Sequence, residues 1–579
     1  MFKTLLKSVR EYKIYAILSP IFVMLEVVFE VLIPYILKLM LDNGIRQGNN
    51  RYVLISGSIM FVCAALALVL GILSGKVATK ASAGFAKNLR HDMYEKIQTY
   101  SFKNIDDFST SSLVARMTND VNQVELSFQM CIRIVVRAPF MLILAFSMAL
   151  FVNSNLAMIF LVIIPFLGVT LIWVMSKSFK PFSRLFYQID ILNRDVEENL
   201  NAIRVVKSFV TEESETAKFC DDSTRLSNYA MKAEKYLAWN MPIVQFAVYA
   251  SMIALAYLAA RYIIVDGIMT TGDLSAYFTY LMQVLMSLMM ISQIFIIIAM
   301  SKTAAVRITE VLTCVPDITN KDNPVFTVKD GSICFDNVDF KYADSSTINN
   351  LSNVSLDIKE GTTVGIIGGT GSGKSTFVQL IPRLYDVTSG KITVGGVDVR
   401  DYDLETLRNS VSYVLQKNVL FSGTIRENLL WGNENATDED LILALKQASA
   451  YDFVMSFPKG LDHDLGQGGV NVSGGQKQRL CIARALLKRP KVLILDDSTS
   501  AVDTKTDALI RRELKTTMPN ATKFIIAQRI SSVEDADMIL VFDDGKIIGQ
   551  GTHSELLKTC SIYSEINDLQ KKGSDSDEF

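Results

Sequence analysis

The chain has 579 residues, an apolar fraction of 50% and a formal net charge of −2. A chain of this length is longer than the usual size of a domain with a single hydrophobic core, so two or more domains are expected. The balanced charge, without a lysine-rich tract or basic residues interleaved with aromatic ones, excludes the usual pattern of a nucleic-acid-binding protein.

Long apolar stretches fill the chain up to about residue 300 and are absent beyond it. Each is long enough to cross a bilayer as a helix, which takes about 20 apolar residues. The later part alternates short β-branched runs with charged helical segments and turn residues, as is typical of a soluble α/β domain. We therefore expect six spans, at residues 14–40, 53–75, 131–152, 155–177, 241–264 and 275–300.

Two connections between the expected spans, residues 76–130 and 178–240, are long and have a helical pattern. At about 1.5 Å per residue, such helices project tens of ångströms beyond the bilayer. Both are rich in lysine and arginine, whereas the loops at 41–52, 153–154 and 265–274 are short and poor in them. The positive-inside rule then predicts a cytoplasmic (inner or plasma) membrane protein whose N-terminus, long connections and C-terminal domain face the cytoplasm.

Two acidic residues, Glu26 and Glu30, interrupt the first expected span. They are four residues apart and so share one face of the helix, with Glu26 near the middle of the bilayer. A carboxylate at that depth is costly unless it meets water or a partner. The pair therefore indicates either a cavity that attracts cations or a structural ion pair with Arg133 or Arg137, and the sequence favours neither.

The last expected span carries several methionine, glutamine and aromatic residues, which adapt to varied apolar ligands and suit a multidrug cavity. Most rows of such residues on a helix serve helix packing or lipid contact. The cargo interpretation is therefore favoured mainly by the family resemblance described below. The candidate cargo residues are Glu26, Glu30, Met286 and Gln293.

A glycine-rich segment, GGTGSGKST, directly follows the apolar run at residues 364–368. Its glycines let the backbone turn tightly, so that successive N–H groups and the start of the next helix point at phosphates. Lys374 adds a positive charge there, and Ser375 can ligate Mg²⁺. The predicted nucleoside triphosphate site comprises Gly368, Gly369, Thr370, Gly371, Ser372, Gly373, Lys374, Ser375 and Thr376.

The apolar run from Lys491 to Asp497 is typical of a buried parallel strand that ends in carboxylates. Asp496 lies at the carboxyl end, where such sheets bind ligands, and is predicted to hold Mg²⁺. Gln416 lies where a polar side chain can reach the metal and the attacking water, although most glutamines are simply solvated. The expected metal ligands are Ser375, Gln416 and Asp496.

A second phosphate cradle is predicted at Ser473, Gly474, Gly475 and Gln476. The Ser-Gly-Gly sequence ahead of a helix exposes backbone N–H groups and a hydroxyl, with the helix dipole behind them. One ATP does not need two cradles in one chain. The economical explanation is that each ATP lies between the glycine loop of one domain and the SGGQ segment of another.

With these motifs in this order, the chain resembles the ATP-binding-cassette (ABC) family, specifically exporters whose half-subunits fuse six spans to one cassette. The resemblance implies an α-helical membrane domain followed by an α/β P-loop NTPase cassette. It also implies a dimer of cassettes that closes on ATP and turns the spans from inward-facing to outward-facing. The expected boundaries are 1–318 for the membrane domain, 319–330 for a linker, 331–572 for the cassette and 573–579 for an acidic tail.

The same resemblance gives each motif a role. Short coupling helices are expected in the two long connections, near residues 108–113 and 211–215. The motif roles are Tyr342 as the aromatic residue that stacks on adenine, 368–376 as Walker A, Gln416 as the Q-loop, 473–476 as the signature that contacts the partner's ATP, 492–497 as Walker B, and 500–503 as the D-loop with Asp503.

Two of the expected catalytic positions, Asp497 and Gln528, depart from the family pattern, whereas Gln416 keeps it. Family members that hydrolyse ATP usually carry Glu and His there. The shorter aspartate withdraws the carboxylate from the attacking water by about an ångström, an error that can cost on the order of a hundredfold in rate. Gln528 can hydrogen-bond a γ-phosphate but cannot become a cation or shuttle a proton.

Two interpretations of these departures remain. Asp497 and Gln528 are tolerated in a working homodimer, where a carboxylate still acts as a weak base, or they mark a degenerate site in a heterodimer. The intact signature favours the second, because in a head-to-tail sandwich it serves the partner's ATP. We expect impaired hydrolysis at the chain's own site and a second half-transporter as partner.

The expected function is ATP-driven export of hydrophobic or amphipathic compounds of the multidrug type. The alternatives are a homodimeric lipid or peptide exporter or flippase, and an ATP-gated channel or sensor. A peptide processor is disfavoured because no peptidase-like extension precedes the first span. An importer is disfavoured because importers usually keep spans and cassettes on separate chains.

Overall fold

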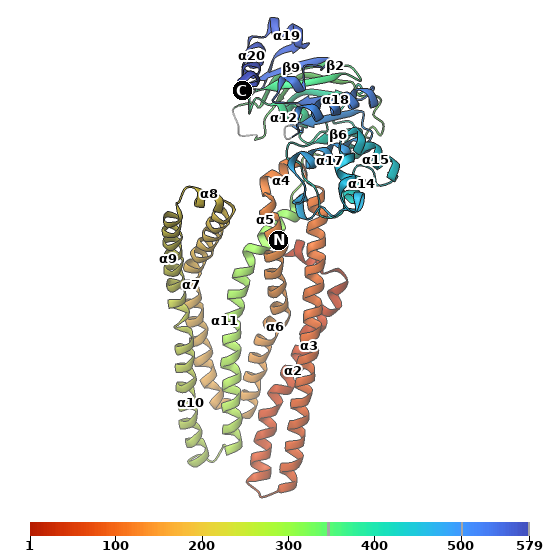
Figure 1. The fold of residues 1–579 in the computed structure, drawn as a ribbon. Coiled ribbons are helices and arrows are strands. Elements are labelled where there is room, and N and C mark those ends of the chain that lie inside the picture. Colours follow the sequence, from red (N-terminus) through yellow and green to blue (C-terminus); the bar gives the residue numbers. More distant parts are fainter. Residues whose placement is uncertain (344–347, 499–501, 577–579) are drawn as a thin grey trace. The chain divides into compact units, whose positions relative to one another are not determined.

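The computed structural model describes residues 1–579 except 344–347, 499–501 and 577–579. The chain forms two compact units, shown in Figure 1. The membrane unit comprises Met1–Gln98 and Thr110–Cys314, and the cassette unit comprises Thr99–Ser109 and Val315–Phe579. A short segment that interrupts the membrane unit in sequence therefore packs with the cassette.

The membrane unit is entirely helical in its described elements, and six of its helical segments are long and apolar enough to cross a bilayer, which confirms the expected spans. The spanning helices are α2 (Lys13–Leu39), α3 (Asn50–Gln98), α6 (Val121–Val152), α7 (Ser154–Asn201), α10 (Asn240–Ile264) and α11 (Thr271–Thr313). The remaining helices are α1 (Phe2–Leu5), η1 (Leu6–Tyr12), η2 (Met40–Ile45), α5 (Thr110–Ala115), η3 (Arg116–Asp120), α8 (Ile203–Ser208) and α9 (Glu212–Leu237).

Small residues bring α2 and α3 close together. The Ser19 and Ser74 hydroxyl oxygens are buried and lie 3.4 Å apart across the contact. A Cβ atom on Gly71 would lie 3.1 Å from Oε1 of Glu26, so the glycine admits the carboxylate between the helices. Close approach through small residues is the usual packing device of spanning helices, and here it fixes the position of Glu26.

The cassette unit is built on two sheets. Its larger sheet has the strand order β10-β9-β3-β8-β7-β6, in which β9, β3, β8, β7 and β6 are parallel and β10 pairs antiparallel with β9. The smaller sheet, β2-β1-β4-β5, is antiparallel. The strands are β1 (Ile333–Phe340), β2 (Leu351–Ile358), β3 (Thr363–Gly368), β4 (Ser389–Val394), β5 (Val397–Asp398), β6 (Val411–Val414), β7 (Val492–Asp496), β8 (Thr522–Ile526), β9 (Met538–Asp543) and β10 (Lys546–Gly551).

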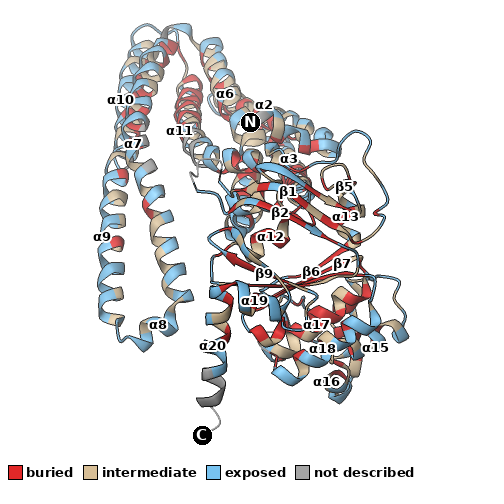
Figure 2. Cartoon of the chain, turned by 90° about the horizontal axis from the view of Figure 1, so that it is seen from above, coloured by how far each residue is buried: buried red, intermediate tan, exposed pale blue. Residues whose placement is uncertain are grey.

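The central strands are buried along their whole length, as Figure 2 shows by their red colour. This explains why β7 and β8 consist of continuous apolar runs rather than alternating ones. The Phe377 ring of α12 stacks on Phe335 of β1 with ring centroids 4.3 Å apart, which ties the helix after the glycine loop to the smaller sheet. The expectation of a six-span helical domain followed by an α/β cassette is confirmed.

Helices cover the larger sheet and extend to the end of the described chain. The predicted acidic tail begins inside the last helix, and residues 577–579 lie outside the described part. The cassette helices are α4 (Phe102–Phe108), α12 (Lys374–Leu380), α13 (Leu404–Ser410), α14 (Ile425–Leu430), α15 (Asp438–Gln447), α16 (Tyr451–Ser456), η4 (Gly460–Asp462), η5 (Gln467–Gly469), α17 (Gly474–Leu487), α18 (Thr504–Thr517), η6 (Ile530–Ser532), α19 (His553–Thr559) and α20 (Ser561–Ser576).

The segment of the first long connection that belongs to the cassette unit is Thr99–Ser109, which contains α4 and overlaps the start of the region expected to hold a coupling helix, residues 108–113. A capping box starts α4, since the Ser101 hydroxyl accepts from the Asn104 N–H while the Asn104 side chain accepts from the Ser101 N–H. The Ser101 hydroxyl also donates to the Asp317 carboxylate at the start of the cassette unit. In the second connection the short helix is α8, which precedes the predicted residues 211–215.

Candidate functional site

The glycine loop connects β3 to α12 and needs its glycines for conformation and space. Gly371 and Gly373 have φ of 82° and 97°, a region that favours glycine. A Cβ atom on Gly368 would lie 2.2 Å from the Phe542 carbonyl oxygen. The loop can therefore run this close to β9 only with glycine at that position.

Lys374 opens α12, and its ammonium group is directed back into the loop. It donates to the carbonyl oxygens of Gly368 at 2.9 Å and Gly369 at 2.6 Å. Burial lowers the pKa of Lys374 from its ordinary value. A phosphate oxygen is a charged acceptor and a stronger one than a carbonyl, so a nucleotide offers this ammonium a better partner than the loop does.

Asp496 ends β7 and meets two hydroxyl groups. Ser375 donates to Oδ1 at 3.0 Å, and Tyr413 donates to Oδ2 at 2.8 Å. Burial raises the pKa of Asp496, with these hydrogen bonds acting in the opposite direction. Paired hydroxyl and carboxylate oxygens are the hard donors that Mg²⁺ prefers, so Ser375 and Asp496 fit this ion, which would neutralise phosphate charge.

Asp497 and the two glutamines form one cluster. Asp497 has a φ of 48°, and its N–H donates to the Ile526 carbonyl of β8 at 3.1 Å. The Gln528 amide donates to Oδ2 of Asp497 at 2.7 Å, and the Gln416 amide lies 3.5 Å from the same oxygen. The structure brings together the three predicted catalytic residues, with Gln416 beside Asp497 rather than hydrogen-bonded to the Ser375–Asp496 pair.

The SGGQ segment forms the N-terminus of α17. The Ser473 hydroxyl accepts from the Gln476 N–H at 3.3 Å, and the Gln476 side chain accepts from the Ser473 N–H at 2.9 Å. Ser473 and Gly474 are exposed, whereas Val472 just before them is buried. In the described part of the chain, no hydrogen bond joins residues 473–476 to the glycine loop, and the capping box uses the N–H groups of Ser473 and Gln476 but not those of Gly474 and Gly475.

The predicted D-loop is described in part, because Ser500 and Ala501 lie outside the described residues. Asp503 caps α18 by accepting from the Thr506 N–H at 2.9 Å. This backbone hydrogen bond lowers the pKa of Asp503. The side chain thus fixes the start of the helix that follows the Walker B strand.

Comparison with known proteins agrees with this geometry. Residues 16–288 match the family described as ABC transporter transmembrane region, and residues 351–500 match the ABC transporter family. The uncharacterized ABC transporter ATP-binding protein YfiB of Bacillus subtilis is 36% identical over 573 residues, covering 99% of both chains. The chain belongs to the ABC transporter family.

Other relatives of similar coverage carry more specific names. A candidate multidrug export ATP-binding/permease protein of Bacillus subtilis, YgaD, is 31% identical and covers 98% of this chain and 99% of its own. An ATP-dependent lipid A-core flippase of Albidiferax ferrireducens is 31% identical and covers 98% of both.

A solved structure has the same fold. A bacterial Atm1-family ABC exporter with ATP bound superposes with a TM-score of 0.83 at 24% identity, covering 97% of this chain and 98% of its own. The chain therefore has the exporter fold, with a membrane domain fused to an ATP-binding cassette that couples ATP hydrolysis to transport.

In this ABC protein the predicted adenine-stacking residue lies against the Walker A helix. The Tyr342 hydroxyl shares a hydrogen bond with Thr376 at 3.0 Å and donates to Gln379 at 3.1 Å. Its ring meets the Tyr385 ring edge-on, with centroids 5.1 Å apart. Tyr342 thus contacts both the nucleotide loop and a second tyrosine.

Tyr385 is a residue of this site that the motif analysis missed. Its hydroxyl donates to the Asp106 carboxylate of α4 at 2.7 Å, and its ring lies edge-on to Phe102, with centroids 6.1 Å apart. Burial and the nearby Asp106 charge raise the pKa of Tyr385. The sequence signal was its place just after the Walker A helix. Tyr385 links the Tyr342 ring to α4, the part of the cassette unit that comes from the first long connection.

We expect Tyr385→Phe to weaken the response of ATP hydrolysis to cargo while leaving ATP affinity within about twofold, since only an exposed hydrogen bond worth about 1 kcal/mol is lost. The phenylalanine ring retains the contact with Tyr342. The measurement is cargo-stimulated ATPase activity of the reconstituted transporter. Tyr402→Phe is the control, because it removes a buried hydroxyl that donates to Val394 far from α4 in sequence. Full stimulation in Tyr385→Phe contradicts the link.

The predicted cargo residues lie in the membrane unit, where they separate into two groups. Arg137 of α6 donates to Glu26 and to both oxygens of Glu30, the latter at 2.8 Å. Glu30 and Met286 line a cavity, whereas Gln293 is exposed and is not among its lining residues. Of the two arginines left open by the sequence, the structure pairs Arg137 with the glutamates.

Proposed function

We propose that this protein is one subunit of a heterodimeric ABC exporter and that its own Walker site hydrolyses ATP poorly. Its signature completes the hydrolytic site on the partner subunit. Each ATP is held with Mg²⁺, for which Ser375 and Asp496 offer the oxygen pair. The cassettes and the N-terminus face the cytoplasm, in keeping with the lysine and arginine content of the long connections.

The contact between Asp497 and Gln528 carries this proposal. A general base must accept the proton of the attacking water, and its carboxylate must therefore be free to approach that water. Here the short aspartate is hydrogen-bonded to the Gln528 amide at 2.7 Å. The amide holds the carboxylate and supplies no proton relay, so the site supports retention of ATP more than its hydrolysis.

The signature supports the other half of the proposal. Its cap geometry is complete, and its first residues are exposed. A chain that had lost hydrolysis altogether would gain nothing from an intact phosphate cradle. The chain keeps Ser473 of the signature but has altered residues at 497 and 528. This combination is consistent with a dimer that has one impaired and one working ATP site.

For the cargo, we propose hydrophobic or amphipathic compounds. The relative YgaD is named for multidrug export, and the cavity beside Glu30 is lined by several methionines, which adapt to ligands of different shape. The relative from Albidiferax ferrireducens is named a lipid A-core flippase, so export of a lipid by a homodimer is the competing function.

Purification with and without the partner tests this function. We expect the chain alone to bind ATP but to hydrolyse it at about a hundredth of the rate of the complex, the cost expected for a displaced general base. The partner is identified as the half-transporter that co-purifies with the full chain. A homodimer that hydrolyses ATP and responds to lipid or drug without a second subunit would overturn the proposal.

A further inference from the structure

Residues 528–532, the Gln528 segment, follow β8 and are held by the helix α20. The side-chain amide of Gln570 donates to the Gln528 carbonyl at 2.8 Å, and its oxygen accepts from the Ile530 N–H at 2.8 Å. One amide thus satisfies a carbonyl and an N–H group two residues apart, as a neighbouring strand would. Strand β8 ends at Ile526, so the ladder of the sheet does not reach these groups.

Helix α20 is anchored in the core of the cassette unit, and this fixes the position of Gln570. Tyr563 is completely buried and Asn567 is 6% exposed. These two residues and Gln570 follow one another at intervals of four and three, so they share one face of the helix. Ile530 belongs to the same buried cluster as Tyr563. The helix and the Gln528 segment therefore meet in the core as well as through the Gln570 amide.

The main chain held by Gln570 carries the Gln528 side chain. The amide nitrogen of Gln528 donates to Oδ2 of Asp497 at 2.7 Å. An amide has two N–H donors, so the second is available to meet a γ-phosphate oxygen, as its place in the sequence predicts. The path from Gln570 to the ATP site therefore consists of one side chain, a short stretch of main chain and the Gln528 side chain.

Space around the Gln528 segment makes these hydrogen bonds important. A cavity of about 120 Å³ lies against the segment, with Asp497, Gln528 and Ser532 in its lining. Neighbouring side chains do not fill this space, so packing alone does not fix Gln528. Ser532 donates to Asp507 of α18 at 2.8 Å, which holds the far end of the segment. The end that carries Gln528 is held by Gln570.

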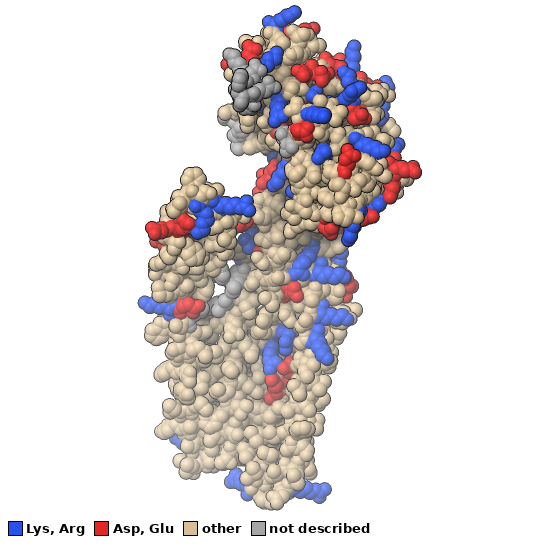
Figure 3. Space-filling view, viewed as in Figure 1, with Lys and Arg blue, Asp and Glu red and all other residues tan. Residues whose placement is uncertain are grey.

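The connection is local rather than a long-range electrostatic one. Gln570 is uncharged, and the lysine, arginine and acidic side chains are interspersed on the face of the cassette unit that Figure 3 shows. Charges of both signs on an exposed surface are largely screened beyond about 8 Å at physiological salt. An effect of Gln570 on the ATP site must then pass through its two hydrogen bonds.

We propose that Gln570 is a positioning residue of the ATP site, which holds the main chain around Gln528 so that the Gln528 amide meets the γ-phosphate of ATP. The C-terminal helix then strengthens the binding of ATP without touching the nucleotide. Binding of ADP, which has no γ-phosphate, does not depend on it. The inference deepens the proposed retention of ATP at this site and rests on it for the role of Gln528.

Two fluorescent nucleotides test the inference. Mant-AMP-PNP has a γ-phosphate and resists hydrolysis, whereas mant-ADP has the same fluorophore, base and first two phosphates. For the full chain in lipid nanodiscs with Mg²⁺, Gln570→Ala is expected to weaken binding of mant-AMP-PNP about fivefold, as for one misplaced hydrogen bond, and to leave mant-ADP within about twofold. Equal weakening of both nucleotides indicates a purely structural role and overturns the proposal, as does no change in either.

Two further variants separate the hydrogen bonds from the rest of the helix. Gln570→Met keeps the length of the side chain without its donor and acceptor, so it is expected to match Gln570→Ala. Normal binding of mant-AMP-PNP by Gln570→Met overturns the proposal. Leu569→Ala is the control, because Leu569 is the adjacent residue of α20 and is 63% exposed. Both nucleotides should bind to it normally, and a selective loss of mant-AMP-PNP there would assign the effect to the helix instead of Gln570.

A double-mutant cycle shows whether Gln570 acts through Gln528. Gln528→Leu has no amide for the γ-phosphate. Adding Gln570→Ala to this variant is expected to change the affinity for mant-AMP-PNP by less than about twofold. A further fivefold loss in the Gln528→Leu background overturns the positioning role, because Gln570 would then act by another route.

This inference and the proposed function fail in different experiments. Nucleotide binding is measured on one chain and without hydrolysis. The contrast between the two nucleotides in a chain shown to be an active homodimer therefore supports the role of Gln570 and removes the heterodimer. Slow hydrolysis by the chain alone, together with unchanged binding of both nucleotides in Gln570→Ala, retains the proposed function and overturns this inference.

Discussion

The double substitution Asp497→Glu with Gln528→His is expected to raise ATP hydrolysis by the chain purified alone by about a hundredfold. Glutamate returns the missing methylene, and histidine replaces the amide that now donates to Asp497 at 2.7 Å. Two copies of this chain offer each other intact signatures, so the repaired Walker site has a competent cradle opposite it. The measurement is steady-state phosphate release at saturating ATP.

The control for this gain uses the same chain. Asp497→Asn with Gln528→His supplies the histidine without a carboxylate base and is expected to give no increase. Adding Ser473→Ala to the repaired chain is expected to remove the gain, because the opposite cradle is then damaged. If the repaired chain binds ATP and dimerises but hydrolyses no faster, these two positions do not limit the site.

Ser473→Ala in the complex with the partner subunit is expected to lower ATP turnover by at least about tenfold, since one hydrogen-bond donor to a phosphate is lost. ATP binding at the chain's own Walker loop should be unchanged, because no hydrogen bond joins residues 473–476 to that loop in the described part of the chain. Turnover is measured as phosphate release, and binding by photolabelling of each chain with an azido-ATP.

Ser473 also caps α17, and its loss costs about 1 kcal/mol of helix stability in its own right. Thr437→Ala is the matched control, because Thr437 forms the same capping box with Asp440 at the start of α15. That variant should lose comparable stability and keep its activity. Unchanged turnover in Ser473→Ala would show that the signature does not serve the other site.

The sequence predicted the parts of this protein that depend on local signals. The spans follow from the length of apolar runs, and the nucleotide loop follows from glycines that no other residue can replace at positions such as Gly368. The cluster of Gln416, Asp497 and Gln528 followed from motif order, although only the structure shows that both amides approach one carboxylate oxygen.

Features that depend on contacts between distant segments were not predictable. The packing of α4 depends on Asp317 and Tyr385, far along the chain, and α4 lies mostly before residues 108–113, where the sequence analysis expected a coupling helix. Its capping pair, Ser101 and Asn104, was the local signal that could have located this helix. Gln293 is not a lining residue of the cavity beside Glu30, since it lies one turn beyond Met290, the last lining position of α11, and its role with cargo stays a prediction.

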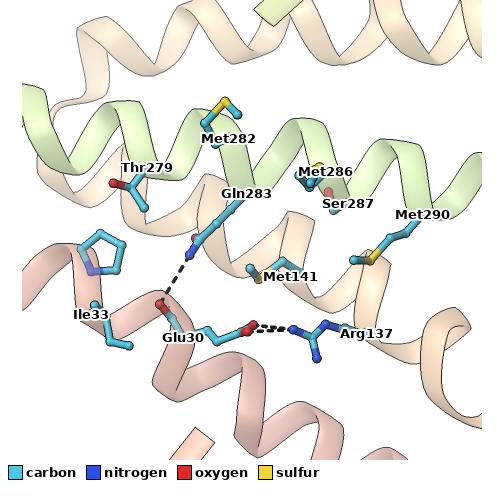
Figure 4. Close-up of a pocket in the computed structure, with 11 residues that line it drawn as sticks. Glu30, Ile33, Arg137, Met141, Thr279, Met282, Gln283, Met286, Ser287 and Met290 are labelled. Atoms are coloured by element: carbon cyan, nitrogen blue, oxygen red, sulfur yellow. Dashed lines mark hydrogen bonds and ion pairs between the residues drawn. The ribbon is translucent and has the colours of Figure 1, made fainter. Parts of the chain in front are cut away.

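The choice between Arg133 and Arg137 also needed the structure. The two arginines share one face of α6, so helical periodicity cannot separate them. Their height along the helix decides, and Arg137 is the one level with both glutamates. The sequence left a cation-attracting cavity and an ion pair as alternatives, and the structure shows the ion pair, of which Glu30 and Arg137 also line a cavity (Figure 4).

The cassette unit is assembled from two separate stretches of the chain, and this affects how its properties are studied. A cassette expressed by itself from Val315 onward would lack α4, and with it the Asp106 carboxylate and the Phe102 ring that meet Tyr385. The Tyr385 hydroxyl would then lose its Asp106 acceptor, next to Tyr342, the residue predicted to stack on adenine. Nucleotide affinity measured on such a fragment would describe a cassette that lacks one of its own packed segments, so the intact chain is the proper material for that measurement.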